Sequence, residues 1–356
     1  MEKIPIYILK SFLFNAAEFS ISELGNGLIN STYQISNFKQ TIVLQKINSK
    51  VFTSPKIVID NYISIFNFLQ QREIPTPLLS NKQLYFTIDE QGDFWRAFEF
   101  INFSTTINLI ENKDQAFSAA YSFGNFTKAL SNFPFSEIKD TIPKFHDLSL
   151  RFDEFEIAIE NASTIRKKNS DLIIIELKNR KSLIHFFETF SKNKAFKKRL
   201  MHHDAKLSNL LFDSRTNKVI TPIDLDTTQA GYYFSDLGDL IRTLTCTESE
   251  SSIKFNSIDI NSQYYDSLVA GYLEAMGNEL SQLELKNIHY AGLLIIYMQA
   301  MRFLTDYLND DIYYRTTYPN QNWDRAKNQL ILLQKLEFYL FSTNKINDYL
   351  STSALK

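Results

Sequence analysis

The stretch Met201–Asp226, MHHDAKLSNLLFDSRTNKVITPIDLD, decides the fold. It opens with a polar run that contains His202, Asp204, Lys206 and Asn209. Two short apolar runs follow, joined by the turn-forming residues Ser-Arg-Thr-Asn, and this pattern predicts a β-hairpin that ends in Ile-Asp-Leu-Asp. Polar groups of several kinds therefore stand at the entrance of a predicted hairpin, and two aspartates stand at its exit.

These residue types suit phosphoryl transfer. A loop carboxylate such as Asp204 can accept a proton from a hydroxyl. Asn209 and Asp224 offer hard oxygen ligands, which Mg²⁺ prefers together with phosphate oxygens. Lys206 supplies a positive charge for a migrating phosphoryl group. Each residue alone is more often a turn former or a helix cap, so the prediction rests on the joint pattern.

The adjacent residues His202 and His203 raise the alternative of a zinc site. No third ligand has a suitable spacing, so a hydrogen-bonded structural role is the better interpretation of His202. The single cysteine, Cys246, cannot form an internal disulfide. That composition predicts a reducing compartment, the cytoplasm.

Composition excludes some classes of partner. The 38 basic and 40 acidic residues give a formal charge of -2. The chain therefore lacks the excess of positive charge that is typical of nucleic-acid-binding proteins. The longest apolar run near the C-terminus, Gly292–Met301, is about half as long as a bilayer span and predicts a buried helix. We therefore expect no membrane partner.

Patterning predicts an α+β chain of 356 residues. The first part alternates β-rich runs with one helix, and the part after Phe103 is mainly helical. Strands are expected within residues 21–35, 41–47, 83–89 and 93–101, and helices at 55–72, 114–131, 151–162, 181–198, 259–276, 281–308 and 323–340. The N-terminal segment, MEKIPIYILKSFLF, predicts a first strand or a first helix.

The spacing H-x-D-x-x-x-x-N before a hairpin that ends in Ile-Asp is the kinase arrangement of catalytic loop and metal loop. MHHDAKLSNLLFD and VITPIDLDTTQAGYYFSDLGDLIRTL resemble the aminoglycoside phosphotransferase and choline kinase superfamily. LQKINSKVFTSP, IPKFHDLSLRFDEFE and MRFLTDYLNDDIYYR are similar to bacterial N-acetylhexosamine 1-kinases. The resemblance implies a protein-kinase-like bilobal fold. A nucleotide-binding lobe of antiparallel sheet plus helix would span residues 1–103, and a larger, mainly helical lobe for catalysis and acceptor binding would span residues 104–356.

The resemblance also implies roles for the residues of the hairpin. Asp204 becomes the base that faces the acceptor hydroxyl, and Lys206 the lysine that follows it. Asn209 and Asp224 become the metal ligands. Asp226 becomes a contact to metal or sugar, and a structural carboxylate at the hairpin end is an equally good interpretation.

One further aspartate and two acceptor residues follow from the resemblance. Asp236 braces the catalytic loop through backbone hydrogen bonds, unless it is an ordinary helix cap. Arg302 and Tyr313 become contacts to the sugar. A salt bridge from Arg302 to Asp306, one helical turn away, is the competing explanation.

The nucleotide site is expected in the N-terminal part. LGNGLINSTY corresponds to the phosphate loop, whose candidate residues are Gly25, Asn26, Gly27, Asn30 and Thr32. Lys46 is the candidate lysine for the ATP phosphates, with Gln45 as the alternative inward residue. Asp60 is the nearby acid that would pair with Lys46, although a solvated helix-face carboxylate is the more ordinary interpretation. Backbone groups from Glu99 to Ile101 would bind adenine.

The sequence thus predicts a kinase that uses ATP and Mg²⁺ on a small acceptor. The preferred acceptor is the anomeric hydroxyl of an N-acetylhexosamine, GlcNAc or GalNAc. Choline, homoserine or an aminoglycoside is the alternative acceptor. A protein kinase is disfavoured because the chain lacks an A-P-E segment and a full glycine loop. A catalytically inactive nucleotide-binding scaffold remains as another class, and the oligomeric state stays open.

Overall fold

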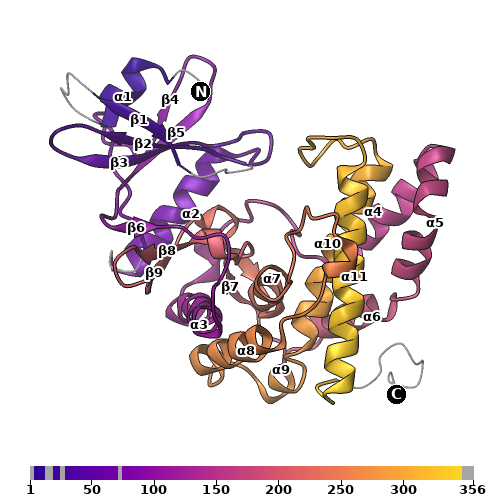
Figure 1. Ribbon diagram of the computed structural model, residues 1–356. Helices are drawn as coiled ribbons and strands as arrows, with labels where there is room; N and C mark the ends of the chain where they lie inside the picture. Colours follow the sequence, from indigo (N-terminus) through magenta and orange to yellow (C-terminus); the bar gives the residue numbers. More distant parts are fainter. Residues whose placement is uncertain (1–3, 13–18, 25–28, 71–73, 347–356) are drawn as a thin grey trace. The chain divides into compact units, whose positions relative to one another are not determined.

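The computed structural model describes residues 4–12, 19–24, 29–70 and 74–346 (Figure 1). Their backbone falls into two compact units. The N-terminal unit comprises Met1–Thr105, Ala129–Pro143 and Leu211–Gln229. The C-terminal unit comprises Thr106–Lys128, Lys144–Leu210 and Ala230–Lys356. A lobe boundary between residues 103 and 104 stays a prediction.

The N-terminal unit is built on an antiparallel sheet with the strand order β1-β2-β3-β5-β4 (Figure 1). Its elements are α1 (Ile6–Phe12), β1 (Ser20–Glu23), β2 (Ser31–Ser36), β3 (Thr41–Lys46), α2 (Pro55–Phe68), β4 (Thr87–Ile88) and β5 (Phe94–Glu99). The first segment is thus a helix, which decides between the two alternatives. The predicted strands and the hairpin of β4 and β5 are confirmed. Proline at the first helical position fits the start of α2, because that position needs no N–H donor.

The strand register separates the two faces of this sheet. Tyr33, Leu44 and Ala97 are opposite one another on β2, β3 and β5, and all three belong to the core that packs against α1. Successive residues of a strand point to opposite faces. Thr32, Gln45 and Arg96, which are also opposite one another, therefore line the other face, where the guanidinium of Arg96 lies 5.9 Å from the ring of Tyr62 in α2.

The predicted hairpin is confirmed and joins a second, smaller sheet. β6 (Ser104–Thr105), β8 (Leu210–Asp213) and β9 (Val219–Pro222) pair in the order β6-β8-β9. After β9 the backbone of Asp224 takes a left-handed conformation, with φ of 61°. The short 3-10 helix η3 (Leu225–Thr227) follows directly. A second 3-10 turn of this unit, η1, spans Phe135–Glu137.

The C-terminal unit is mainly helical (Figure 1). Its helices are α3 (Lys113–Ala129), α4 (Leu148–Asn161), α5 (Thr164–Lys178), α6 (Ser182–Lys192), α7 (Phe234–Leu244), α8 (Ser262–Met276), α9 (Gln282–Lys286), α10 (Tyr290–Leu308) and α11 (Gln321–Ser342). The short strands β7 (Arg199–Met201) and β10 (Gln229–Gly231) pair with each other. The 3-10 turns η2 (Leu207–Asn209) and η4 (Phe255–Ser257) complete the unit. The predicted mixed α+β fold class, with an antiparallel N-terminal sheet and a larger helical C-terminal region, is confirmed.

Helix α10 is the core of the C-terminal unit, and it packs against α4, α7 and α11. Its apolar run Gly292–Met301 is buried along most of its length, as predicted. Gly238 of α7 permits close approach, because a Cβ atom there would lie 2.4 Å from the carbonyl oxygen of Ala291. No helix in the described parts of the chain combines the length and the hydrophobicity that a bilayer crossing requires.

Two helix predictions were incomplete. The expected helix at residues 281–308 is interrupted, since α9 ends at Lys286 and α10 begins at Tyr290. Helix α5 was not predicted. It buries Ser170, Ile173 and Leu177 but places Ile165 and Leu172 in solvent, with exposed fractions of 73% and 79%, so its apolar residues are not confined to the buried side.

Candidate active site

The polar run before the hairpin forms a compact constellation in the C-terminal unit. One carboxylate oxygen of Asp204, Oδ2, accepts hydrogen bonds from Lys206 Nζ at 2.8 Å and from Asn209 Nδ2 at 2.9 Å. Asn209 Nδ2 also donates to the Asp204 carbonyl oxygen at 2.9 Å. The structure thus brings together three residues that the spacing singled out, and the Asp204 side chain stays 26% exposed.

The positive charge of Lys206 lowers the pKa of the Asp204 carboxylate. Burial alone would raise the pKa of Asp204, but the ammonium of Lys206 and the hydrogen bonds from Lys206 and Asn209 outweigh it. The pKa of Asp204 therefore lies below its ordinary value. At neutral pH Asp204 is a carboxylate, the form that can accept a proton.

Asp236 holds the backbone that leads to Asp204. Its Oδ2 accepts from the His202 N–H at 2.9 Å and its Oδ1 from the His203 N–H at 2.7 Å, so the predicted brace is confirmed. Burial raises the pKa of Asp236 to about 6. Asp236 lies in the first turn of α7, but its carboxylate bonds the loop.

His202 has the structural role that the spacing favoured. Its ring is buried against the ring of Phe123, at 5.1 Å between centroids, and its Nδ1 accepts from the Asp204 N–H at 3.3 Å. Among the described residues no three His, Cys, Asp or Glu side chains gather as a metal-binding group.

In the N-terminal unit, Asp226 is enclosed by protein groups. Arg96 Nη2 donates to its Oδ1, and Asn30 Nδ2 donates to its Oδ2 at 2.7 Å. The side chains of Arg96 and Asp226 are only 4% and 3% exposed. This network favours the structural interpretation of Asp226, and its contact to metal or sugar stays a prediction.

The metal-ligand roles of Asn209 and Asp224 stay predictions, and each residue is described within its own unit. Asn209 turns its amide nitrogen to Asp204, so its amide oxygen is the side that can serve as a ligand. Asp224 provides a carboxylate from a left-handed backbone, a conformation that aspartate adopts more readily than most residues with a Cβ atom. One or two protein oxygens are what Mg²⁺ needs when phosphate oxygens complete its shell.

In the N-terminal unit, the two cations Lys46 and Arg96 lie on opposite faces of the sheet and have different partners. Lys46 Nζ pairs with Asp93 at 2.8 Å, on the strand face opposite to Gln45. Gln45 Oε1 accepts from Arg96 Nη2 at 2.6 Å. Asp60 pairs instead with Lys56 in solvent, as a helix-face carboxylate does. The role of Lys46 at the ATP phosphates stays a prediction, and Arg96 is the cation that sequence analysis overlooked.

The other predicted nucleotide residues have mixed placements. Gly25, Asn26 and Gly27 lie outside the described residues. Asn30 supports Asp226 and accepts the Asn48 N–H at 3.0 Å, while Thr32 Oγ1 accepts from Gln45 at 3.1 Å. Asn30 and Thr32 are thus part of the same polar network as Gln45 and Arg96.

The predicted adenine segment follows β5. The Glu99 N–H donates to the Thr76 carbonyl at 2.9 Å, and the Ile101 carbonyl accepts from the Ser104 hydroxyl at 2.6 Å. The Phe100 N–H also donates, to the Thr41 carbonyl at 3.3 Å, so three of the backbone groups expected at adenine have protein partners. The adenine contact of Glu99 and Ile101 stays a prediction.

Arg302 stands among aromatic rings in the C-terminal unit. Its guanidinium carbon lies 5.2 Å from the Phe145 ring, 5.8 Å from the Tyr313 ring and 5.5 Å from the Tyr314 ring. Its Nη1 donates to Gln299 Oε1 at 3.3 Å, and it forms no ion pair within the described parts of the chain. The alternative salt bridge to Asp306 is not formed, because the Asp306 carboxylate accepts the N–H groups of Tyr313 and Tyr314 at 2.8 Å.

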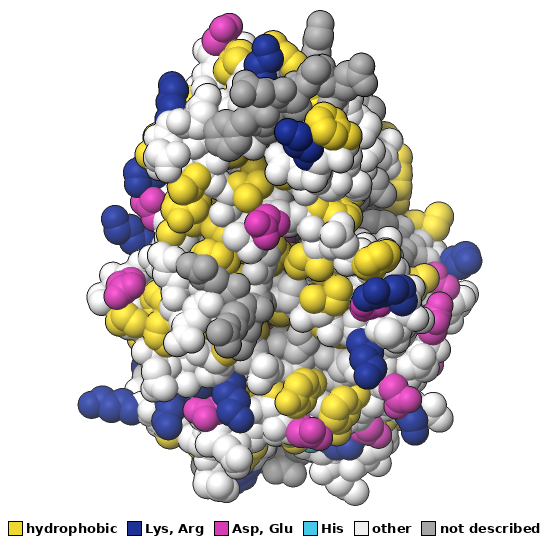
Figure 2. Space-filling view, turned by 90° about the vertical axis from the view of Figure 1, so that its left-hand side faces the viewer, with side chains coloured by type: hydrophobic (Ala, Val, Ile, Leu, Met, Phe, Trp, Pro, Cys, Tyr) yellow, Lys and Arg dark blue, Asp and Glu magenta, His cyan; other side chains and the backbone are white. Residues whose placement is uncertain are grey.

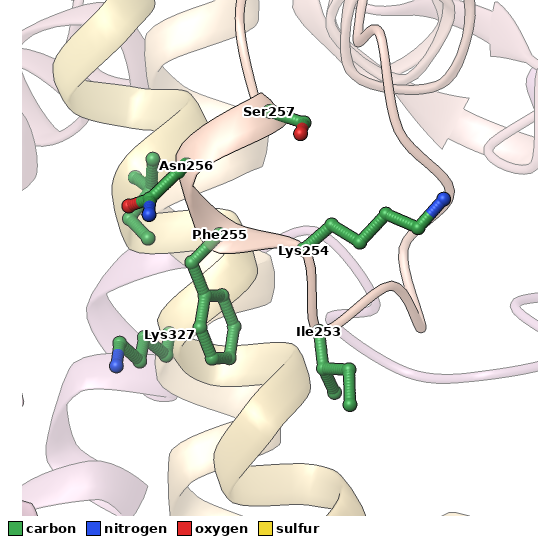
Figure 3. Close-up of a pocket in the computed structure, with 7 residues that line it drawn as sticks. Ile253, Lys254, Phe255, Asn256, Ser257 and Lys327 are labelled. Atoms are coloured by element: carbon green, nitrogen blue, oxygen red, sulfur yellow. The ribbon is translucent and has the colours of Figure 1, made fainter.

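The surface adds no field of one sign on the face that Figure 2 shows, where described basic and acidic side chains are interspersed. The C-terminal unit contains a hollow of about 480 Å³, and Figure 3 shows the side chains that line it. It is lined by Ile253, Lys254, Phe255, Asn256, Ser257, Lys327 and Ile331. None of the described residues predicted for the active site contributes to this hollow.

The fold and the Asp204 constellation together define a protein-kinase-like phosphotransferase. Residues 20–282 match the phosphotransferase enzyme family, and the chain belongs to this family.

Solved structures show the same fold. An aminoglycoside phosphotransferase from Alicyclobacillus acidocaldarius is 12% identical, with a TM-score of 0.66 over 97% of this chain and 96% of that one. An amicoumacin kinase is 14% identical, with a TM-score of 0.63 over 93% and 92%. A choline kinase from Cryptosporidium parvum is 14% identical, with a TM-score of 0.53 over 94% and 93%. At these identities the likeness concerns the fold.

Proposed function

We propose that this phosphotransferase is a small-molecule kinase that transfers the γ-phosphoryl group of ATP to a hydroxyl of an N-acetylhexosamine. The anomeric hydroxyl of GlcNAc or GalNAc is the proposed acceptor, and the product is the sugar 1-phosphate. The observation that carries the kinase assignment is the constellation in which Asp204 accepts hydrogen bonds from Lys206 and Asn209.

Asp204 acts as the base in the proposed reaction. Its ionised carboxylate takes the proton of the acceptor hydroxyl while the hydroxyl oxygen bonds to the γ-phosphorus. The bond from the γ-phosphorus to its bridging oxygen breaks, and ADP leaves with that electron pair. Lys206, which touches Asp204, supplies positive charge to the phosphoryl oxygens as they pass.

Asn209 and Asp224 would supply oxygen ligands to Mg²⁺, whose charge offsets the negative charge of the phosphates. Nucleotide and metal use is supported by the amicoumacin kinase structure, a complex with AMP-PNP and Ca²⁺. Lys46 is the proposed phosphate-binding lysine. Arg96, buried next to Asp226 and opposite Gln45, is the second candidate for this charge.

Arg302 and Tyr313 are the proposed contacts to the acceptor. A guanidinium among three aromatic rings, without a carboxylate partner in the described chain, can donate hydrogen bonds to sugar oxygens while a ring packs on the sugar face. A choline site would instead need acidic groups beside its aromatic rings, since its ligand is a cation. Arg302 therefore favours a neutral or anionic acceptor.

Similar folds act on several acceptors, among them aminopropanol and choline by their names, so the acceptor needs a direct test. The purified full chain is incubated with ATP, Mg²⁺ and a panel of GlcNAc, GalNAc, choline, homoserine and aminoglycosides, and ADP release and phosphorylated product are measured. We expect product with GlcNAc or GalNAc. Turnover only on choline, homoserine or an aminoglycoside would refute the sugar assignment and leave the kinase assignment intact.

The same assay addresses the inactive scaffold. Normal nucleotide binding without turnover on any acceptor would support that alternative and refute the kinase assignment. The cytoplasmic location is a part of the proposal that the assay leaves untouched, and the oligomeric state stays open.

A further inference from the structure

We propose that His146 and Gly231 are positioning residues for Asp204. They lock the side chain of His203, and the locked side chain holds the left-handed backbone from which Asp204 follows. This inference rests on the proposed role of Asp204 as the base. Neither His146 nor Gly231 carries chemistry of its own in the reaction, because both act through His203.

The backbone at His203 is left-handed, which is uncommon for a residue other than glycine. Its φ is 65°, in the left-handed region that glycine adopts freely and that a residue with a Cβ atom adopts at a cost. Such conformations persist where the surroundings over-determine them, and they gather at functional sites. Asp204 is the next residue, so the conformation at His203 sets the direction in which the Asp204 side chain leaves the loop.

His146 forms one side of the lock. Its Nδ1 lies 3.3 Å from Nδ1 of His203, so one imidazole donates to the other, and the two rings meet edge to face at 4.9 Å. Phe145 stacks on His146 at 4.7 Å between centroids. Burial, together with the nearby His203 and Arg302, holds the pKa of His146 well below its usual range, so this ring is neutral. A neutral imidazole can be either the donor or the acceptor of the hydrogen bond to His203.

Gly231 forms the other side. A Cβ atom at this position would lie 2.5 Å from Cε1 and 2.6 Å from Nε2 of the His203 ring. Only glycine leaves room for the His203 ring beside strand β10. The His203 side chain is therefore held by residues that are distant in sequence, on the segment before α4 and on β10.

The backbone is held independently by Asp236, which accepts the His203 N–H at 2.7 Å. Asp236 fixes where the loop lies, while the lock on the ring fixes the rotation of the chain at His203. A glycine at position 203 would reach the same φ without a side chain. The account therefore predicts a specific pattern of coupling: the need for His146 and Gly231 should vanish when the His203 ring is removed.

The test uses the full chain with four variants, H146A, G231A, H203G and the double variant H203G/G231A. The readouts are kcat and the KM for ATP on the acceptor that the panel identifies, together with the thermal midpoint of unfolding. His185, an exposed histidine on α6, provides the matched control H185A.

We expect G231A and H146A to lower kcat by about 10- to 100-fold, the scale of a small misplacement of a catalytic group. The KM for ATP should change by less than about twofold, because a positioning defect affects the reacting geometry rather than nucleotide binding. H203G/G231A should have the kcat of H203G alone, and H185A should behave as the wild type.

If the Gly231→Ala substitution lowers kcat by the same factor in the wild type and in H203G, the two positions act independently and the lock is overturned. A lowered thermal midpoint in G231A with an unchanged kcat would overturn it as well, because the role would be purely structural. An inactive wild type would refute the proposed function instead. The lock would then be judged by the thermal midpoint of G231A, which should recover in H203G/G231A; no recovery would refute the lock.

Discussion

Asp226→Ala should destabilise the N-terminal unit strongly. Arg96 and Asp226 are 4% and 3% exposed, so the substitution would leave the guanidinium of Arg96 buried without a carboxylate. Gln45 Oε1 would remain as its acceptor, and Nη1 of Arg96 has no hydrogen-bond partner among the described residues already. Removing one partner of a buried ion pair costs about 3–5 kcal/mol of unfolding free energy.

The ion pair of Lys46 and Asp93 on the same sheet is the matched control. Its side chains are 20% and 28% exposed, so Asp93→Ala should cost about 0–1 kcal/mol. Replacing both Arg96 and Asp226 by apolar residues should cost less than Asp226→Ala, because no buried charge is left behind.

Urea unfolding followed by tryptophan fluorescence measures these differences. Trp95 neighbours Arg96 on β5 and reports on the N-terminal unit, while Trp323 in α11 reports on the C-terminal unit. A loss below about 1 kcal/mol for Asp226→Ala, or a larger loss for the double replacement than for the single one, would refute the reasoning about the buried pair.

Further predictions concern pH and the acceptor. Burial raises the pKa of Asp236 to about 6, above its unfolded value, so its contribution to stability is present at low pH and is lost as the pH rises through about 6. Asp236→Asn should remove this part of the pH dependence of the unfolding free energy, measured by urea titrations at several pH values. An unchanged dependence of the unfolding free energy on pH would contradict the assignment. Because Lys206 lowers the pKa of Asp204, Lys206→Met should move the acid limb of the kcat/KM profile to higher pH, and an unmoved limb would count against this coupling. Arg302→Met should raise the KM for the acceptor by about tenfold or more and leave the KM for ATP unchanged, whereas equal changes in both constants would argue against a place in the acceptor site.

The contiguous part of the site could be predicted from the sequence. Asp204 contacts Lys206 and Asn209 within a short loop. Their spacing in the sequence was therefore enough to predict that these side chains lie together. The hairpin β8–β9 was predictable for the same reason, since its turn and its apolar runs are adjacent in the chain.

Contacts between distant segments were not predictable. Arg96 and Asp226 are 130 positions apart in the sequence. The strand register that sets Arg96 opposite Gln45 could not be predicted from the residues near either of them. A lone arginine inside the apolar run of β5 was the available signal, because a buried charge needs a partner. His146 and His203 are 57 positions apart, and only the fold reveals that their rings touch.

Helix α5 illustrates a different limit. Three of its apolar residues, Ile165, Leu172 and Ile175, are exposed beside the buried Ile173 and Leu177, so the hydrophobic periodicity that marks most helices is weak. Helix α9 ends at Lys286, with Asn287 as its C-cap. The sequence on both sides of this break has a helical pattern, so the break was not predicted.

The central claim is that Asp204 is the base of a phosphoryl transfer to a small hydroxyl acceptor. Asp204→Asn keeps the size of the side chain and removes its ability to take a proton. The most direct measurement is kcat for this variant at saturating ATP, Mg²⁺ and acceptor, with nucleotide binding measured in parallel. The account predicts a loss of about 10²–10⁴-fold in kcat with nucleotide binding retained. A variant that turns over at nearly the wild-type rate would contradict it.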